Sequence, residues 1–344
     1  MIHISFQVNI HWGSHWLHRK NKQQSITTQE QRLEERAQEA MEELSRRRAK
    51  STIDNYQTAL HSLLTYAGKD IKVSDINTAL MEGYQRWLQI RGVGRNTSSC
   101  YMRSLRALLH HIQPEREYKE AFKNVFTGNE KTEKRALGVE VIKNLTSKPT
   151  PNPSLREGNK KDSKEVEKGK NSKEAEMGMA RDYFLFSFCA MGMPFVDLAF
   201  LRKAQVKEGY IDYRRHKTGQ HIRVKIEPLM QEIIDKYARK GSTYLFPILT
   251  SSDHEQAMRE YERKRSKYNR LLGQLAKKAQ LPHLTSYVAR HSWASIAYSN
   301  NVGLPIISKA MGHTSTQTTL TYISEINDQR IEEANFQLVK NIEH

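Results

Sequence analysis

Apolar residues recur every three or four positions through much of this chain, which is the spacing of one face of an α-helix. Between residues 50 and 112 three such runs follow one another, separated by short polar or glycine-containing breaks. We expect helices that begin near Thr52, Asn77 and Asn96, where small polar residues supply N-caps. Together these helices predict a small helical bundle.

The pattern changes after residue 180, where helix-like and strand-like segments alternate. Residues 183–191 are almost continuously apolar, as in a buried helix. Residues 210–213 and 222–226 read as strands on either side of a Thr218–Gly219 turn, which predicts a β-hairpin. Further helices are predicted from Pro228 through Tyr237 and over residues 255–279, 288–299, 304–311, 315–323 and 325–341. The predicted fold is therefore mainly α with a small β-hairpin or sheet (α+β).

Residues 147–178 lack the apolar spacing of the segments around them. Three prolines, no aromatic residue and a dense mixture of lysine and glutamate fall in this stretch. Because too little apolar surface is present to offset the entropy of the chain, we expect this stretch to be disordered.

The charge of the chain indicates a polyanionic partner. Lys and Arg number 55 against 38 Asp and Glu, which gives a formal net charge of +17. Such an excess favours binding to nucleic acid or to an anionic membrane surface, and a merely soluble basic protein is the alternative. Since the chain has no stretch of about 18 apolar residues and no basic segment before its first apolar positions, we expect neither a membrane span nor a secretory signal. Cys100 and Cys189 predict buried thiols in a reducing cytoplasm, not a disulfide or a metal site.

The first fifty residues contain two further segments. Residues 1–20 alternate apolar and polar positions and are expected to form a strand. Residues 29–50 are charged and helix-favouring, and they end in Arg46-Arg47-Arg48. This second segment fits either a solvated helix or an arm that contacts a DNA backbone, and the sequence leaves both interpretations open.

Three short motifs near the end of the chain carry the clearest chemistry. Ala289-Arg290-His291-Ser292, Met311-Gly312-His313 and Tyr322 follow one another in this order. A tyrosine hydroxyl can attack a phosphodiester while an arginine and a histidine hydrogen-bond the phosphate oxygens in the transition state. Tyr322 follows His313 by nine positions, which is enough for a turn and about one and a half turns of helix, so both side chains can reach one phosphate.

These motifs resemble those of a known family. The segments "ARHSWAS" (289–295), "KAMGHTSTQTTLTYI" (309–323) and "RHKTGQ" (215–220) are similar to the catalytic boxes of the tyrosine recombinases, or phage-type integrases, and in particular to the integrases of Bacteroides-type mobile elements. The resemblance extends from about residue 46 to the C-terminus. It implies an N-terminal extension at 1–45, a helical core-binding (SAM-like) DNA-binding domain at 46–130, and a catalytic domain at 131–344 with a disordered insertion at 147–178.

The resemblance also implies a role for each site residue. Tyr322 would be the nucleophile that forms a 3′-phosphotyrosyl intermediate, and Arg290 would bind the scissile phosphate. His313 would hydrogen-bond the same oxygens or assist deprotonation of Tyr322. Lys217, at the tip of the hairpin, would be the general acid for the leaving 5′-oxygen. Tyr287 stands where the family usually has a histidine, and its hydroxyl can still donate a hydrogen bond to phosphate.

One family residue is missing. The first box usually reads Gly-Leu-Arg followed by an apolar residue and an acid, whereas this chain reads Gly192-Met193-Pro194-Phe195-Val196-Asp197. Pro194 stands in place of the first catalytic arginine and offers phosphate no side-chain donor. Another arginine would have to compensate, and the sequence does not distinguish between the candidates Arg202, Arg214 and Arg215. Asp197 and His291 are expected to have supporting or structural roles.

The implied partner is double-stranded DNA. We expect Arg95, Arg103 and Arg106 on one helix face, together with Arg46, Arg47 and Arg48, to contact it. A homotetramer on synapsed DNA, a free monomer, a possible DNA-bending accessory protein and a cytoplasmic, nucleoid-associated bacterial location follow from the resemblance. So does a reaction without metal, ATP or other cofactor.

The sequence leaves two other functions open. A catalytically impaired DNA-binding protein is conceivable because of Pro194, and a type IB topoisomerase-like enzyme would share the tyrosine chemistry. The predicted helix 325–341 is amphipathic, and it fits docking either within its own subunit or onto a neighbour.

Overall fold

A computed structural model of the chain describes residues 31–130, 136–147 and 165–323. The chain divides into two compact units, Met1–Thr132 and Glu133–His344, close to the predicted boundary after residue 130. The predicted strand at 1–20 and the predicted helix at 325–341 lie outside the described residues. In the described ranges no helix combines the length and apolarity needed to cross a lipid bilayer.

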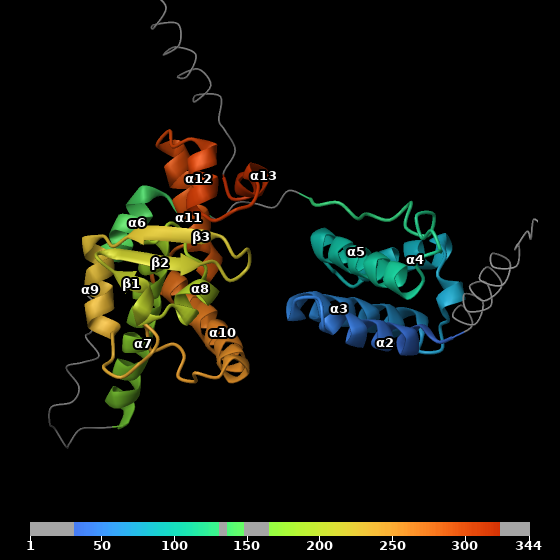
Figure 1. Cartoon of the computed structure of the whole chain (residues 1–344), viewed down its shortest axis with the longest axis horizontal. Helices are drawn as coiled ribbons and strands as arrows, with labels where there is room; N and C mark the ends of the chain where they lie inside the picture. The colour runs from blue at the N-terminus through green and yellow to red at the C-terminus, as the bar shows by residue number, and fades with distance from the viewer. Residues whose placement is uncertain (1–30, 131–135, 148–164, 324–344) are drawn as a thin grey trace, which may run out of the picture. The chain divides into compact units, whose positions relative to one another are not determined.

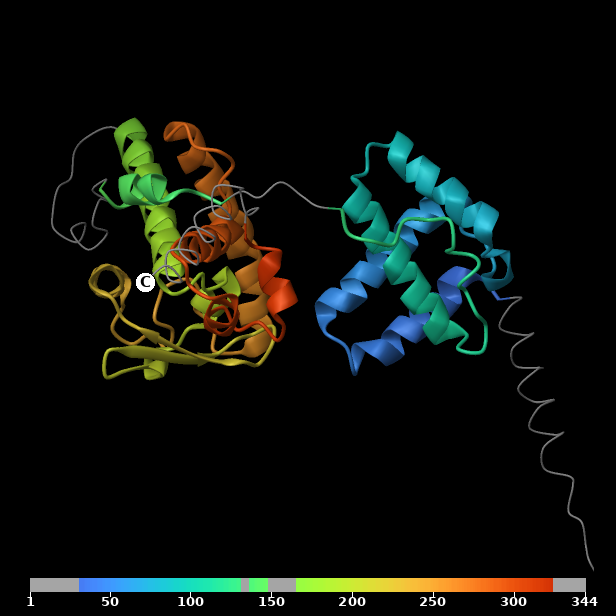
Figure 2. The ribbon, with the colours of Figure 1, turned by 90° about the horizontal axis from the view of Figure 1, so that it is seen from above.

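The N-terminal unit is a helical bundle, as predicted (Figures 1 and 2). Its helices are α2 (Leu33–Ser45), α3 (Lys50–Ala67), α4 (Thr78–Ile90) and α5 (Arg95–Ile112), with a 3₁₀ turn at Val73–Asp75. Asn77 caps α4, because its side-chain oxygen accepts a hydrogen bond from the Leu80 N–H at 3.0 Å. The predicted start of α3 at Thr52 is wrong. Ala49 is the N-cap and its carbonyl already accepts the N–H of Thr52, so that residue lies within the first turn.

Helix α2 belongs to this bundle and corrects the predicted extension at 1–45. Leu33, Ala37 and Met41 are buried in the same apolar core as α3 and α5. The Leu33 N–H also donates to the carbonyl of Ile71, which fixes the start of the helix to the loop after α3. The charged residues of α2 occupy its outer face, so the high overall polarity of the segment concealed a buried apolar stripe.

The C-terminal unit packs its helices against one face of a small sheet, which lies on one side of the unit (Figures 1 and 2). Strands β1 (Val206–Lys207), β2 (Tyr210–Arg214) and β3 (His221–Lys225) form an antiparallel sheet in the order β1-β2-β3, and β2 and β3 form the predicted hairpin. The helices are α6 (Val139–Thr146), α7 (Glu165–Cys189), α8 (Phe195–Phe200), α9 (Pro228–Tyr237), α10 (His254–Lys278), α11 (Ser286–Ser299), α12 (Leu304–Ala310) and α13 (Thr316–Leu320), with a 3₁₀ turn at Lys203–Gln205. Central helix α7 packs against α9, α10 and α11.

Helix α7 corrects the prediction of disorder at 147–178. Residues 148–164 lie outside the described residues, but 165–178 are helical and continue into the buried apolar half of α7. Glu174 and Glu176 form ion pairs with Lys278 and Lys267 of α10. A helix already nucleated by its apolar half extends at low entropic cost, and pairing with α10 then favours the charged turns.

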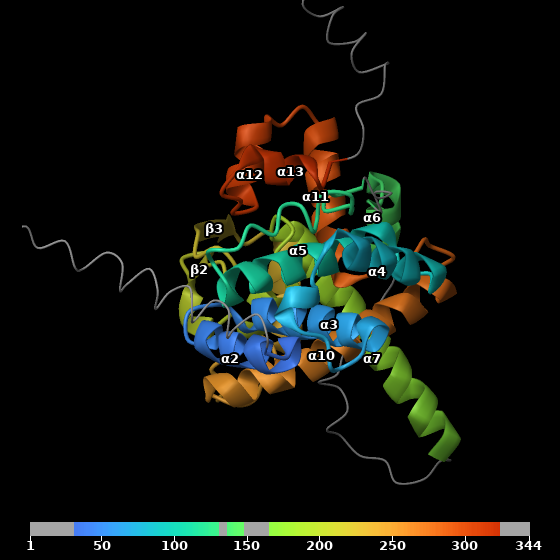
Figure 3. The same ribbon diagram turned by 90° about the vertical axis from the view of Figure 1, so that its right-hand side faces the viewer.

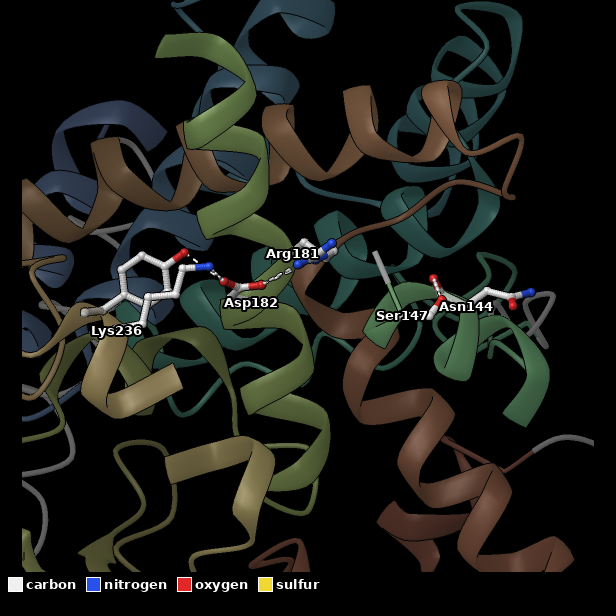
Figure 4. Close-up of polar contacts among 6 residues, drawn as sticks. Asn144, Ser147, Arg181, Asp182 and Lys236 are labelled. Atoms are coloured by element: carbon white, nitrogen blue, oxygen red, sulfur yellow. Dashed lines mark hydrogen bonds and ion pairs between the residues drawn. The ribbon is translucent and has the colours of Figure 1, made fainter. Parts of the chain in front are cut away.

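A buried polar cluster joins α7 to α9 (Figure 4). The carboxylate of Asp182 accepts hydrogen bonds from Arg181 Nη2 at 3.1 Å, Lys236 Nζ at 2.8 Å and the Tyr237 hydroxyl at 2.8 Å. Figure 4 shows Arg181 and Lys236 on opposite sides of this carboxylate. Asp182 is only 4% exposed, so these donors replace the water that the charge loses on folding.

A second, smaller apolar cluster holds the last described helices together. Ala294, Ile307, Met311 and Ile323 are buried in it, with Tyr322 packed against its edge. Figures 1 and 3 show α11, α12 and α13 gathered at one end of the unit, beside β3. This cluster places the three C-terminal motifs of the sequence on one small group of helices.

Candidate active site

Arg290 is the most enclosed of the predicted site residues. It lies on α11 and is 2% exposed. Its Nη1 donates to the carbonyl of Gly192 at 2.7 Å and its Nη2 donates to the carbonyl of Met311 at 2.6 Å. Nε is buried and has no hydrogen-bond partner among the described residues. Burial and the neighbouring charge of Arg215 lower the pKa of Arg290 from its ordinary value, although an arginine stays cationic.

Arg215 joins Arg290 at the same turn. Its Nη1 donates to the carbonyl of Gly312 at 2.9 Å, one peptide unit after the carbonyl that binds Arg290. Arg215 is 4% exposed, and within the described part of the chain its buried Nε has no hydrogen-bond partner. Gly312 has φ +63°, and a Cβ there would lie 3.1 Å from Arg215 Cδ. The glycine therefore gives the turn both its conformation and the space for this side chain.

The structure thereby separates the three candidates for the missing arginine. Arg214 is exposed and donates to the carbonyl of Gly219 at 3.3 Å. Arg202 is exposed beside the 3₁₀ turn, where its backbone bridges to Tyr244. Arg215 alone of the three is buried with Arg290. The strand pattern contained a signal for this, because Arg215 continues the buried alternation of Ile211 and Tyr213.

Pro194 and Asp197 sit at the beginning of α8. Pro194 is the N-cap residue of this helix and contributes no donor. Asp197 is 5% exposed, and its Oδ1 accepts the backbone N–H of His216 at 2.8 Å. Burial raises the pKa of Asp197, while the hydrogen bond from His216 and the charges of Arg215 and Arg290 act in the opposite direction. Asp197 thus fixes the hairpin loop beside the two arginines.

His313 lies against Arg290 at the end of the turn. Its Nε2 is 2.9 Å from Arg290 Nη2 and its Nδ1 is 2.8 Å from Thr319 Oγ1. Partial burial, followed by the charges of Arg290, Arg215 and Lys217, lowers the pKa of His313 to about 4. The imidazole is therefore neutral at physiological pH. Thr319 was not among the residues that the sequence indicated, because a threonine in a short polar helix carries no distinctive signal.

Tyr322 packs on the same group of residues. Its ring centroid lies 5.2 Å from that of His313 and 4.7 Å from that of His291, and Arg290 Cζ lies 5.4 Å from the ring centroid. The carbonyl of Tyr322 accepts the hydroxyl of Ser295 at 3.2 Å and faces His291 Nδ1 at 3.4 Å. The predicted supporting role of His291 fits this position, where it contacts the ring and backbone of the tyrosine.

Lys217 and Tyr287 lie at the rim of this cluster. Lys217 is exposed in the turn between β2 and β3, near enough to His313 for its charge to act on that pKa. The turn itself is tied to the cluster, because Thr218 Oγ1 donates to the carbonyl of Gly312 at 3.1 Å. Tyr287 is 49% exposed, and its ring centroid is 6.4 Å from that of His291.

The predicted DNA-contacting arginines divide into two groups. Arg46, Arg47, Arg48 and Arg106 are exposed. Arg95, which is also exposed, and Arg103 contact the segment that follows the bundle: Arg95 stacks on Phe126, and Arg103 Nη1 donates to Asn129 Oδ1 at 3.1 Å. The second pair therefore has a structural contact in addition to any that it makes with DNA.

Comparison with known proteins bears on this arrangement. Residues 32–120 match the family model of the phage integrase SAM-like domain, and residues 164–329 match that of the phage integrase family. The chain carries phage integrase (tyrosine recombinase) domains. The first matched range begins beside α2, in agreement with the assignment of this helix to the bundle. A search among curated protein sequences gave no match.

Solved structures of integrases share the fold of this phage integrase domain and its helical partner. A lambda integrase dimer bound to a COC′ core site has 14% sequence identity and a TM-score of 0.60, over 93% of this chain and 85% of that chain. The Tn1549 transposon integrase in complex with circular intermediate DNA has 15% identity and a TM-score of 0.59, over 87% and 98%. A lambda integrase tetramer bound to a Holliday junction has 13% identity and a TM-score of 0.60, over 87% and 80%. The narrower resemblance to Bacteroides-type elements stays a prediction.

Proposed function

We propose that this protein is a site-specific DNA recombinase that cuts and rejoins DNA through a covalent bond to Tyr322. The observation that carries the proposal is the burial of Arg215 and Arg290 at neighbouring peptide units, with Tyr322 and His313 against one of them. Asp197, the buried carboxylate beside these two guanidiniums, offsets at most one of their positive charges, so the site favours a further anion. A phosphodiester supplies that anion at the position where the phenol can attack.

Arg215 takes the place of the arginine that is missing at Pro194. It reaches the site from the end of β2, whereas the family position lies at the start of α8. The two guanidiniums together retain N–H groups without described acceptors, including both Nε atoms. They would bind the non-bridging oxygens and stabilise the charge that develops there in the transition state. This substitution supports an active enzyme over an inactive DNA-binding protein.

The reaction follows from the placement of the remaining groups. The Tyr322 oxygen attacks phosphorus, the P–O5′ bond breaks, and the Lys217 ammonium gives a proton to the leaving 5′-oxygen. The phosphotyrosine bond conserves the energy of the original diester, so attack by a 5′-hydroxyl from another strand reverses the step. Lys217, on a turn tied to Gly312 by Thr218, can approach the phosphate without leaving the site.

Double-stranded DNA is the proposed substrate. The net charge of +17 favours it through counterion release, and the exposed arginines at 46–48 and 106 offer phosphate contacts. The integrase structures with this fold include a dimer on a core site and a tetramer on a Holliday junction. We propose a corresponding tetramer on synapsed DNA for this chain, in a reaction that moves or inverts a mobile element.

A nicked suicide substrate tests the proposal. Its sequence comes from the ends of the element that carries the gene, and loss of the short fragment traps any covalent complex. The wild-type protein should give a protein–DNA band that survives denaturation, and Tyr322→Phe should give none. Binding without a covalent band would favour the inactive DNA-binding protein. Cleavage together with supercoil relaxation on DNA that lacks any such site would favour a topoisomerase.

A further inference from the structure

The two nitrogens of His313 have different partners. Nε2 faces Arg290 Nη2 at 2.9 Å, and Nδ1 faces the hydroxyl of Thr319 at 2.8 Å. A guanidinium has only N–H donors and no acceptor. Nε2 must therefore carry a lone pair, since a proton there would point at another N–H group.

The position of the remaining proton follows from this contact. A neutral imidazole has one N–H, so in His313 the proton is on Nδ1 and is donated to Thr319 Oγ1. The lowered pKa of His313, about 4, agrees with a neutral ring. Thr319 is fully buried and holds this hydrogen bond away from water.

Thr319 also connects the imidazole to the nucleophile. It precedes Tyr322 by three residues, and its carbonyl accepts the backbone N–H of Tyr322 at 2.9 Å. The side chain of Thr319 thus orients His313 while its backbone orients Tyr322, and the rings of these two residues lie 5.2 Å apart with an interplanar angle of 28°.

We propose that Thr319 is a positioning residue that accepts the Nδ1 proton of His313 and holds its ring in place, so that Nε2, whose lone pair faces Arg290 in the free protein, is the general base that accepts the proton of Tyr322. This inference rests on the proposed recombinase function and assigns the proton acceptor in it. The other residues near the phenol fit that task less well. Tyr287, at the usual place of an imidazole, is a neutral phenol, and His291 meets Tyr322 at its ring and its carbonyl.

The proton transfer balances within the site. When DNA binds, Arg290 Nη2 turns from His313 Nε2 to a phosphate oxygen. The Tyr322 hydroxyl proton then passes to Nε2 as the P–Oη bond forms and the P–O5′ bond breaks, and Lys217 protonates the 5′-oxygen. His313 becomes an imidazolium and Lys217 an amine. Burial and then the charges of Arg290, Arg215 and Lys217 keep His313 neutral in the free protein, and the phosphate charge offsets the repulsion by these cations.

The tautomer can be measured directly without any activity. Nitrogen-15 spectra of the full-length protein with labelled histidine distinguish protonated from unprotonated ring nitrogens, and His313→Gln identifies the His313 signals. We expect a protonated Nδ1 and an unprotonated Nε2 at pH 7. In Thr319→Val, which keeps the shape of the side chain and removes its hydroxyl, Nδ1–H loses its acceptor, so the Nδ1 signals should shift while Nε2 stays unprotonated opposite Arg290. An Nε2–H tautomer in the wild type would overturn the proposal.

Cleavage kinetics test the catalytic consequence. On the suicide substrate we expect Thr319→Val to slow covalent complex formation about tenfold to a hundredfold, less than loss of the base itself, which typically costs about 10²–10⁴-fold. Thr319→Ser should restore most of the rate. Thr318→Val is the matched control, because this exposed threonine precedes Thr319 on the same helix, and its rate should equal that of the wild type.

Changing the leaving group of the substrate distinguishes a variant that lacks the general acid from one that lacks the general base. A substrate with sulfur at the 5′-bridging position needs no general acid, so it should rescue Lys217→Ala and leave Thr319→Val and His313→Gln slow. Rescue of all three variants, or wild-type rates for Thr319→Val on both substrates, would contradict the assignment of the base. Absence of any covalent complex with wild-type protein would instead overturn the proposed function. The nitrogen-15 measurement does not depend on activity, so it would still test the protonation of His313.

Discussion

A Cβ atom on Gly192 would lie 2.8 Å from the Cα of Arg290. Gly192 also has φ +71°, and its carbonyl accepts a hydrogen bond from Arg290 Nη1. The glycine at the start of the first family box is therefore a direct structural support for the arginine of the second box. A glycine is needed at position 192 for two reasons: the backbone of Arg290 lies too close for a side chain, and the backbone of residue 192 has a positive φ.

Gly192→Ala should disrupt the site through this contact. The methyl group has to displace the backbone of α11, so we expect loss of covalent complex formation and a decrease of about 1–3 kcal/mol in the free energy of unfolding. Gly209→Ala is the matched control, because its φ is +76° and nothing lies within 4 Å of a Cβ there. It should show the conformational cost alone and full cleavage activity. Equal activity of both variants would mean that Arg290 tolerates the shift.

Arg215→Ala should abolish cleavage if this residue replaces the missing arginine. Removal of one charged donor from a transition state typically lowers the rate by about 10²–10³. Arg215→Lys should recover little, because an ammonium lacks the forked donors of the guanidinium. The single variants Arg214→Ala and Arg202→Ala are matched controls on exposed neighbours. Rates of covalent complex formation on the suicide substrate decide the question, and a larger loss in Arg202→Ala would assign the role to that residue.

The low pKa of His313 predicts how stability depends on pH. Its ordinary value is 6.5 and its folded value is about 4. Between these values the unfolded chain binds the proton and the folded protein does not, so the contribution of His313 is complete above pH 6.5 and is lost as pH falls toward 4. Urea unfolding at several pH values should show this decrease. His313→Gln should weaken it, and an identical slope in the variant would contradict the pKa assignment.

The low pKa of His313 also predicts how the cleavage rate depends on pH below neutrality. In the free protein His313 keeps its lone pair at all pH values well above 4, so its protonation should not reduce the rate of cleavage at limiting DNA concentration, which reports the free protein, between pH 5.5 and 8. A loss of activity with a midpoint near 6.5 would mean that the imidazole titrates normally and that the cationic neighbours do not act on it.

Asp182 should be important for stability and not for chemistry. Asp182→Ala leaves Lys236 and Arg181 without their shared carboxylate in a buried site, which typically costs about 3–5 kcal/mol. Glu176→Gln breaks a more exposed pair with Lys267 and should cost less than about 1 kcal/mol. Urea unfolding at pH 7 compares the two. A small effect of Asp182→Ala would mean that water replaces the carboxylate in this cluster.

The sequence by itself determined most of the local elements and the family resemblance on which the proposed chemistry rests. Helix periodicity and the hairpin turn are properties of short segments, so their positions could be predicted to within a few residues. The order of the boxes around Arg290, His313 and Tyr322 indicated the family, whose domain models match this chain. The prediction was wrong for two charged segments, α2 and the first half of α7. Their high polarity suggested an extension and a disordered stretch, whereas α2 packs into the bundle core and α7 forms ion pairs with α10.

Only the tertiary structure decided which groups act together. Arg215 and Gly312 are separated by 97 positions, and Arg290 and Gly192 by 98, yet each pair shares a hydrogen bond. Nothing in the chain near Pro194 indicates that Arg215, just after β2, would be the proposed substitute for the missing arginine. The tautomer of His313 likewise depends on one donor from α11 and one hydroxyl from α13. Such contacts arise from the packing of distant elements around a shared core, which no local pattern encodes.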